Sequence, residues 1–205
     1  MKLPARLQTI CEMVPRGAII VDVGTDHGHV ARRRGAVGSE REFHRLPSRT
    51  DIPRVVADGL RGFRSVDVAI ITGMGPRPIL KILSAGPFPT QAVVHAPQGS
   101  HVLRRGLAEQ GWRIEEERLA PENDAFAEVI RIRRGTETHS GHTLEFGPFL
   151  PHDPLCRPHA ALRIQAWQTL AQQAPPNTEA HQRAVAWVDW LEELLERLPP
   201  MGSTH

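Results

Sequence analysis

The sequence predicts an α/β fold built on a doubly wound sheet, followed by a C-terminal pair of antiparallel helices. Apolar residues 18–21 lead into Asp22 and a glycine-bearing turn, a pattern typical of a buried central strand that ends at a binding site. Apolar strand patterns then alternate with helical patterns, which is the mark of a doubly wound sheet. Beyond residue 149 apolar residues recur only at helical spacing, so the last part of the chain is expected to be helical.

The first third of the chain is expected to supply two helices and four strands. Apolar residues within 3–14 recur at helical spacing, which predicts an amphipathic N-terminal helix. A second helix is expected to begin at Val30. Between residues 35 and 53 there are too few sizeable apolar residues for a full helix, so a polar loop is expected after the short strand that ends near Glu40. The strands are expected at residues 18–23, 36–40, 54–60 and 66–72.

The rest of the chain divides at a polar, glycine-bearing stretch. We expect residues 135–147 to be a linker, which separates a domain at 1–147 from a helical pair at 148–205. Leu162 and Leu170 are expected to bury the seam of this pair, together with Trp187. The remaining elements are a helix at 78–83, a strand at 91–96, a helix at 99–110, an acidic connection to a strand at 126–132, and helices at 154–173 and 179–198.

Composition places the chain among ordinary soluble proteins. No apolar run reaches the ~18 residues of a membrane span, and residues 1–6 lack the apolar core of a signal peptide. The two cysteines, Cys11 and Cys156, are far apart, which fits a reducing compartment, so a cytoplasmic location without membrane contact is expected. A formal net charge of +2 permits a nucleic-acid partner without requiring one.

The turn after the first strand is the first candidate site. Gly24 allows a sharp turn without a side chain, and Gly28 allows the next segment to pack close to the strand. The spacing Asp-x-Gly-x-x-x-Gly is looser than a dinucleotide fingerprint and suits a nucleoside without a pyrophosphate better. A plain strand-to-helix turn, with glycine present for steric reasons alone, is the alternative.

Short motifs at the predicted strand ends form a more specific combination. They are Asp22-Val23-Gly24-Thr25-Asp26-His27-Gly28, Ala57-Asp58-Gly59-Leu60, Thr72-Gly73-Met74-Gly75, Ala96-Pro97-Gln98, and Pro121-Glu122-Asn123-Asp124 through Glu128. With Arg6-Leu7 in the first helix and the segment 145–150 before the helical pair, this combination resembles the bacterial tRNA (adenine(22)-N(1))-methyltransferase family. The resemblance covers nearly the whole chain.

The resemblance implies a Rossmann-like class I methyltransferase fold with a coiled-coil-like helical domain, S-adenosyl-L-methionine (SAM) as cofactor, tRNA as partner and no metal. It assigns Asp58 and Gly59 to the adenine end of the cofactor and Glu40 to its ribose hydroxyls. Gly73, Met74 and Gly75 stand where the methyl group meets the target base. The methionine and ribose side of the cofactor is assigned to the first turn, with Asp22, Gly24, Thr25, Asp26, His27 and Gly28.

Two residues of that turn are candidate catalytic groups. Methylation of adenine N1 uses a ring lone pair, so alignment matters more than a strong base, and the base must leave its pairing to reach the cofactor. Asp26 could stabilise the positive charge that develops on the methylated ring, and His27 could donate a hydrogen bond or relay a proton. Each residue also has a structural interpretation as the alternative to a catalytic role: Asp26 could cap the next helix, and His27 could form hydrogen bonds within the turn.

The chain departs from the family pattern at several positions, which keeps two other functions open. Only 31 residues separate Asp26 from Asp58, Gln98 stands where the family has asparagine, and Ala127 stands where a tyrosine is usual. A catalytically impaired member that binds tRNA or a protein is therefore one alternative. A metal-dependent hydrolase is the other, suggested by 11 histidines and the run from Asp26 to His29, although no partner motif for a metal accompanies them.

Overall fold

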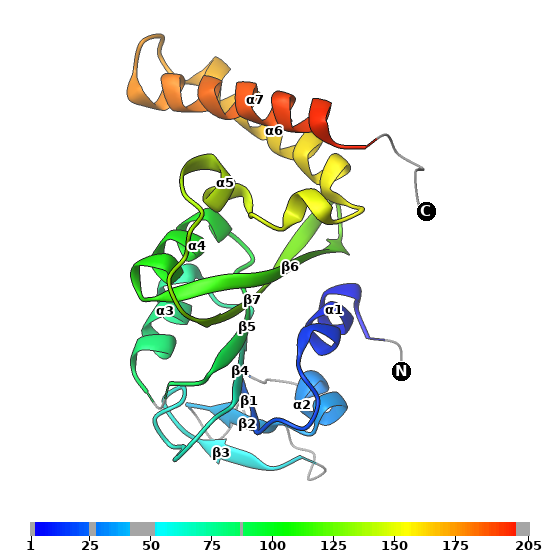
Figure 1. Ribbon diagram of the computed structural model, residues 1–205, viewed down its shortest axis with the longest axis vertical. Helices are drawn as coiled ribbons and strands as arrows, with labels where there is room; N and C mark the ends of the chain where they lie inside the picture. The colour runs from blue at the N-terminus through cyan, green and yellow to red at the C-terminus, as the bar shows by residue number, and fades with distance from the viewer. Residues whose placement is uncertain (1–2, 25–27, 42–51, 87, 200–205) are drawn as a thin grey trace.

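A seven-stranded sheet with helices on both faces forms the body of the protein, as the computed structural model shows for residues 3–24, 28–41, 52–86 and 88–199 (Figure 1). The strands are β1 (Ile20–Val23), β2 (Val37–Glu40), β3 (Arg54–Val56), β4 (Val68–Thr72), β5 (Gln91–His95), β6 (Trp112–Glu122) and β7 (Ala125–Arg134). The helices are α1 (Ala5–Met13), α2 (His29–Arg34), α3 (Pro76–Ser84), α4 (Ser100–Glu109), α5 (Gly141–Phe146), η2 (Leu150–His152), α6 (Cys156–Gln173) and α7 (Glu179–Arg197). The predicted α/β class is confirmed.

The strand order β3-β2-β1-β4-β5-β7-β6 creates a switch point between β1 and β4. The strands β1 to β5 are parallel, whereas β7 runs antiparallel to β5 and to β6. The chain builds outward from β1 to β3 and then returns to place β4 on the other side of β1. Because the carboxyl ends of β1, β2 and β4 meet at one edge, the turns that follow them are brought together, as expected for a ligand site in such a sheet.

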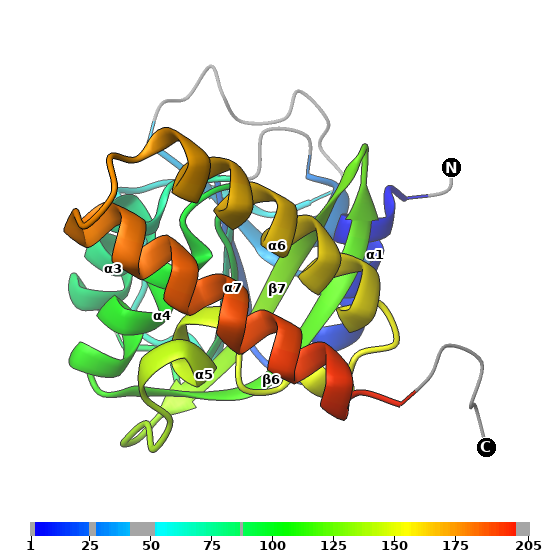
Figure 2. The same cartoon turned by 90° about the horizontal axis from the view of Figure 1, so that it is seen from above.

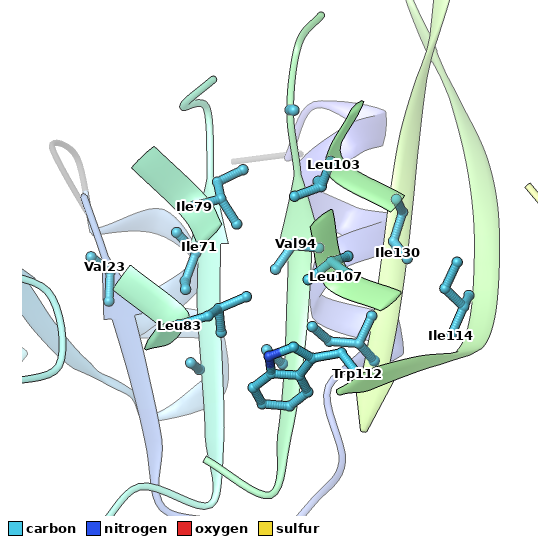
Figure 3. Close-up of a cluster of buried hydrophobic side chains, with 14 of the residues drawn as sticks. Val23, Ile71, Ile79, Leu83, Val94, Leu103, Leu107, Trp112, Ile114 and Ile130 are labelled. Carbon is cyan, nitrogen blue, oxygen red and sulfur yellow. The ribbon is translucent and has the colours of Figure 1, made fainter. Parts of the chain in front are cut away.

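Two apolar clusters hold the helices against the two faces of the sheet. On one face α3 and α4 contribute Ile79, Leu83, Leu103 and Leu107, which pack over the sheet beside the fully buried Trp112 (Figure 3). On the other face α1 and α2 cover the sheet, with Ile10 and Val30 among the buried residues. The alternation of side chains along each strand supplies both clusters, since a central parallel strand must be apolar on both sides.

The acidic run at residues 115–117 lies inside a strand rather than in the expected connection. The strand β6 continues through these glutamates and pairs with β7 along its length. Arginines satisfy the charges: Arg133 Nε lies 2.8 Å from Glu115 Oε1, and an Nη of Arg131 lies 2.9 Å from Glu116 Oε2. Opposite charges across neighbouring strands offset the low strand propensity of glutamate, which the sequence pattern alone does not reveal.

The stretch expected to be a linker, residues 135–147, contains the helix α5. Its Phe146 is 2% exposed and joins Leu119 of β6 in the cluster that also buries the helical pair. The division at residue 147 therefore stays a prediction, because side chains on both sides of it share one core. The expected polar loop between residues 41 and 53 falls largely on 42–51, outside the described residues.

The helical pair, α6 and α7, lies side by side across the end of the β6–β7 hairpin (Figure 2). Trp187 is 1% exposed and stacks on Trp167 with 5.5 Å between ring centroids, as expected for a residue of the seam. The expectation for Leu162 and Leu170 is wrong, because both are about 40% exposed. Besides Ile164, the fully buried residues of α6 are small or polar, which hid this face from the sequence pattern: Cys156, His159 and Ala160.

A buried cluster of charges connects α4 to the hairpin and the C-terminal segment. Arg104 is 1% exposed, and its Nε lies 2.7 Å from Glu117 Oε1 while an Nη lies 2.7 Å from Glu128 Oε2. The other Nη donates to the carbonyl of Glu145 at 3.1 Å. Burial by itself would raise the pKa of Glu128. The charge of Arg104 and the smaller contribution of His159 outweigh this effect and lower the pKa below its usual value.

Replacing Arg104 by alanine is expected to lower the free energy of unfolding by about 3–5 kcal/mol, because two buried carboxylates lose their counter-charge. Urea denaturation followed by circular dichroism measures the change. Arg113→Ala is the matched control, since Arg113 is 52% exposed in its pair with Glu115 and should cost less than about 1 kcal/mol. Equal losses of unfolding free energy in the two variants would show that the buried cluster contributes no more to stability than an exposed ion pair.

Trp187→Ala is expected to destabilise the helical pair by about 3–5 kcal/mol, because a large buried side chain leaves a cavity. Since no residue of the cluster around Trp187 comes from β1 to β5, the affinity for the expected cofactor SAM should not change. Thermal unfolding and calorimetric titration with SAM test the two parts. Val185→Ala, at a position 39% exposed on the same helix, is the control for stability. Loss of SAM binding in the Trp187 variant would argue against separate folding units.

Candidate functional site

A cavity of about 540 Å³ opens at the carboxyl ends of β1 and β2 and is closed on one side by α3. Its volume lies within the ~300–1,000 Å³ typical of small-molecule sites. Five residues expected from the sequence line it: Gly24, Glu40, Asp58, Gly59 and Met74. They come from four separate stretches of the chain, so the parallel pairing of the strands is what gathers them.

Two glycines keep the cavity open. Gly24 has φ +79°, and a Cβ at this position would lie 2.6 Å from Cε of Met74. Gly59 has φ +65°, and a Cβ there would lie 3.0 Å from Cγ2 of Ile82 on α3. Both positions therefore favour glycine for backbone conformation, and Gly59 also for space, whereas the flexible end of Met74 could move away from a side chain at position 24. A ligand can approach the backbone closely at both points.

Backbone and hydroxyl groups tie the two glycine turns to β2. The amide of Gly24 donates to the carbonyl of Ser39 at 2.9 Å, and the buried hydroxyl of Ser39 donates to the carbonyl of Gly59 at 2.8 Å. Ser39 itself lines the cavity. The walls are thus held by hydrogen bonds within the sheet, which preorganises the cavity before any ligand arrives.

The cavity carries two carboxylates with different surroundings. Glu40, the last residue of β2, is 8% exposed. Asp58 is 48% exposed at its side chain and forms ion pairs with two exposed arginines, with 3.3 Å to Nε of Arg41 and 3.4 Å to an Nη of Arg61. Such exposed pairs contribute little to stability, so a ligand can compete for Asp58 at small cost. Glu40 is the sheltered acceptor, and Asp58 stands at the mouth.

The other sequence-predicted residues lie around the cavity without lining it. Asp22 is buried in β1, and Ile20, two residues before it on the same side of the strand, packs against α1 and α2. Gly28 is the N-cap of α2, and Gly75 is the N-cap of α3. Gly73 has φ +76° and donates its amide to the carbonyl of His95 at 3.2 Å. Thr25, Asp26 and His27 fall outside the described residues, so their assigned roles stay predictions.

Several lining residues were not expected from the sequence. Ser39 and Arg41 flank Glu40 directly, so extending that assignment along the chain would have found them. Lys81 and Ile82 lie on α3, where the helical pattern only predicts a core face. Arg61 follows the Asp-Gly turn by two residues and carries no motif of its own. A helix contributes to a cavity through its position over the sheet, which local sequence does not encode.

The donor set suits a nucleoside cofactor better than a metal. A deep carboxylate beside two bare backbone turns matches a ribose diol and an adenine ring, both of which need acceptors and close backbone approach. Within residues 3–24, 28–41, 52–86 and 88–199, no three His, Cys, Asp or Glu side chains converge as metal ligands. Across the same residues no helix combines the length and apolar character needed to cross a membrane.

Comparison with known proteins assigns the family. The family model for tRNA (adenine(22)-N(1))-methyltransferase matches residues 40–195, and a model described as a methyltransferase domain matches residues 3–34. A tRNA (adenine(22)-N(1))-methyltransferase of Bacillus subtilis is 26% identical over 183 residues, which cover 73% of this chain and 75% of the relative.

Solved structures agree with this assignment. A putative tRNA (m1A22) methyltransferase of Streptococcus pneumoniae superposes with a TM-score of 0.79 at 26% identity, covering 95% of this chain and 100% of that one. The same protein in complex with SAM gives a TM-score of 0.73. The fold is also shared with M. capricolum TrmK in complex with S-adenosyl-homocysteine, with a TM-score of 0.78 at 17% identity, covering 97% of this chain and 100% of that one. The chain belongs to the tRNA (adenine(22)-N(1))-methyltransferase family.

Proposed function

We propose that this SAM-dependent methyltransferase binds its cofactor in the cavity between β1, β2 and α3 and methylates N1 of adenine 22 in tRNA. The observation that carries the proposal is the meeting of Gly24, Glu40 and Gly59 in one cavity of about 540 Å³. When bound, the cofactor supplies an electrophilic methyl group on a sulfonium. The chain itself has to hold the cofactor, orient the base and exclude water.

The cofactor-binding roles follow from the position of each group. Glu40, deep at the end of β2, would accept hydrogen bonds from the ribose hydroxyls. Asp58, at the mouth of the cavity, would accept a hydrogen bond from the exocyclic amine of the cofactor's adenine. This bond would replace its ion pairs with two exposed arginines. At Gly24, where no side chain intervenes, the methionine part of the cofactor would lie close to the backbone, opposite the side chain of Met74. Asp22 and Gly28 would act indirectly, by shaping the turn between β1 and α2.

Methyl transfer at N1 depends on alignment more than on proton transfer. Holding two reactants in line can recover about 7 kcal/mol or more of the barrier. The turn after β4, with Gly73, Met74 and Gly75, lies between the cofactor cavity and the end of β5, where a base turned out of its helix could approach. Asp26 and His27 are proposed to stabilise the charge on the methylated ring and to donate or relay a proton beside it.

The tRNA partner and a cytoplasmic location belong to the same proposal. The family assignment supports tRNA as the substrate, and the cytoplasm is the compartment in which this substrate and SAM would meet. The impaired-member alternative is supported only by the sequence departures. It predicts that tRNA binds without methyl transfer, so one assay separates it from the enzyme.

Glu40→Gln is expected to weaken SAM binding about 10- to 100-fold, because a neutral amide replaces the charged acceptor of two hydroxyls. Isothermal titration with SAM measures the dissociation constant. The control is Glu109→Gln, which removes the same charge from an exposed position at the end of α4. An unchanged affinity in the Glu40 variant, with folding verified by circular dichroism, would remove Glu40 from the cofactor site.

Incubating the wild-type protein with labelled SAM and a tRNA bearing adenine 22 is expected to yield 1-methyladenosine at that position. Replacing adenine 22 by guanine should abolish incorporation, since guanine N1 carries a proton and has no lone pair in the ring plane. Nucleoside mass spectrometry and position mapping measure the product. Methylation that persists in the guanine-substituted tRNA would show a different target, and tRNA binding without any product would favour the impaired member.

A further inference from the structure

A second cavity, of about 230 Å³, lies at the carboxyl end of β5. The segment Ala96-Pro97-Gln98 lines one side, the start of β7 a second side, and Leu162 and Arg163 of α6 a third. Its volume is below the ~300–1,000 Å³ of sites for whole drug-sized ligands, which suits a single heterocycle. Ala125 and Ala127 contribute small side chains to the wall, and Phe126 contributes an aromatic one.

This cavity is adjacent to the turn that borders the cofactor cavity. The amide of Gly73 donates to the carbonyl of His95, and Met74, the next residue, lines the cofactor cavity. On the other side, a Cβ on Gly99 would lie 3.0 Å from Cγ of Pro76, so the loops after β4 and β5 are in close contact. The two cavities therefore lie on either side of the turn after β4.

His95 is a buried functional group of this cavity that the proposed mechanism does not use. It is 2% exposed, and its Nδ1 lies 3.1 Å from the carbonyl oxygen of Glu128. A carbonyl oxygen can only accept, so Nδ1 carries the hydrogen and the neutral ring presents Nε2 as an acceptor. Burial, with Arg6 as a smaller contribution, lowers the pKa of His95 and keeps the ring neutral near pH 7.

Within the described residues, Nε2 of His95 is buried without a hydrogen-bond partner. Two other buried lining groups, Glu128 and His159, are titratable, and each has a charged or titratable partner. Glu128 is held by Arg104, and His159 Nε2 lies 3.4 Å from Glu128 Oε1. An orphaned buried acceptor costs free energy unless a ligand satisfies it. Nε2 therefore indicates a ligand with a hydrogen-bond donor.

We propose that this second cavity receives the target base of the tRNA and that Nε2 of His95 accepts a hydrogen bond from the exocyclic amine of adenine. The inference rests on the proposed function and adds a residue that determines base specificity. The amine adjoins N1 on the Watson–Crick edge, so holding it orients N1 toward the turn after β4. Guanine carries a carbonyl oxygen at the same place, and two acceptors facing each other repel.

The test compares two substrates, tRNA with adenine 22 and tRNA with unsubstituted purine 22, which lacks the amine. In the wild type, the ratio of their kcat/KM values depends on two effects: the difference in intrinsic reactivity between the two rings, and the hydrogen bond with His95, which only adenine can form. In His95→Leu only the intrinsic part remains, so the preference for adenine is expected to fall about tenfold or more. His95→Gln, which keeps an acceptor, is expected to restore part of the preference.

His101→Leu is the matched control, because His101 lies on α4 and does not line the cavity. Its preference for adenine should equal that of wild type. Circular dichroism and SAM titration verify that each variant folds and binds its cofactor. If wild type methylates adenine 22 and His95→Leu keeps the full preference, the role of His95 is overturned while the proposed function stands.

A second readout does not require turnover. In protein labelled with ¹⁵N-histidine and saturated with S-adenosyl-homocysteine, the Nε2 resonance of His95 is expected to shift with the adenine 22 tRNA and to stay in place with the purine 22 tRNA. An absent shift overturns the inference. A shift without any methylated product would retain the base contact and reject the proposed function, so the two failures are distinguishable.

Discussion

The parallel pairing of β1 with both β2 and β4 is the constraint on which the rest of the structure depends. This pairing brings Gly24, Glu40 and Met74, which are far apart in the chain, to one edge of the sheet. It also places the turn after β4 between two cavities, one at the β1–β2 side and one at the β5–β7 side. The proposed placement of a methyl donor beside the target base therefore rests on strand order in the first instance.

The C-terminal helical pair is more than an appendage to this sheet. Its core includes Leu119 of β6 and Phe146 of α5, and its α6 supplies Leu162 and Arg163 to the cavity at the end of β5. The charged cluster around Arg104 ties α4 to the same hairpin and to the backbone at Glu145. A displacement of α6 would therefore reshape the wall of the second cavity.

Charged and polar groups of this protein differ in how far their neighbours compensate them. Arg104, Glu117 and Glu128 compensate one another in a region that needs rigidity. Around the cavities, the ion-pair partners of Asp58 within the described residues are two exposed arginines, and Nε2 of His95 has no hydrogen-bond partner among those residues. Groups that are to meet a ligand are expected to be incompletely satisfied by the protein itself.

The succession of most strands and helices along the chain could be predicted from the sequence. Strands buried on both faces must be apolar, and the apolar residues of an amphipathic helix must recur about every 3.6 residues. The same reasoning failed for the glutamates of β6, whose strand is stabilised by arginines on β7, and for the buried face of α6, where His159 and Cys156 replace apolar residues. In both cases partners distant in the chain override local preference.

For the site, the sequence by itself determined which turns carry glycine and which strand ends carry an acid, since these depend on local conformation at residues such as Gly24 and Asp58. Only the tertiary structure decided that Glu40 lies in the same cavity as Gly24 and Gly59 while Asp22 does not line it. It alone also placed His95 beside Glu128 and thereby assigned the proton to Nδ1. The physical reason is that strand pairing and packing set distances between segments, and those distances have no signature in the local order of residues.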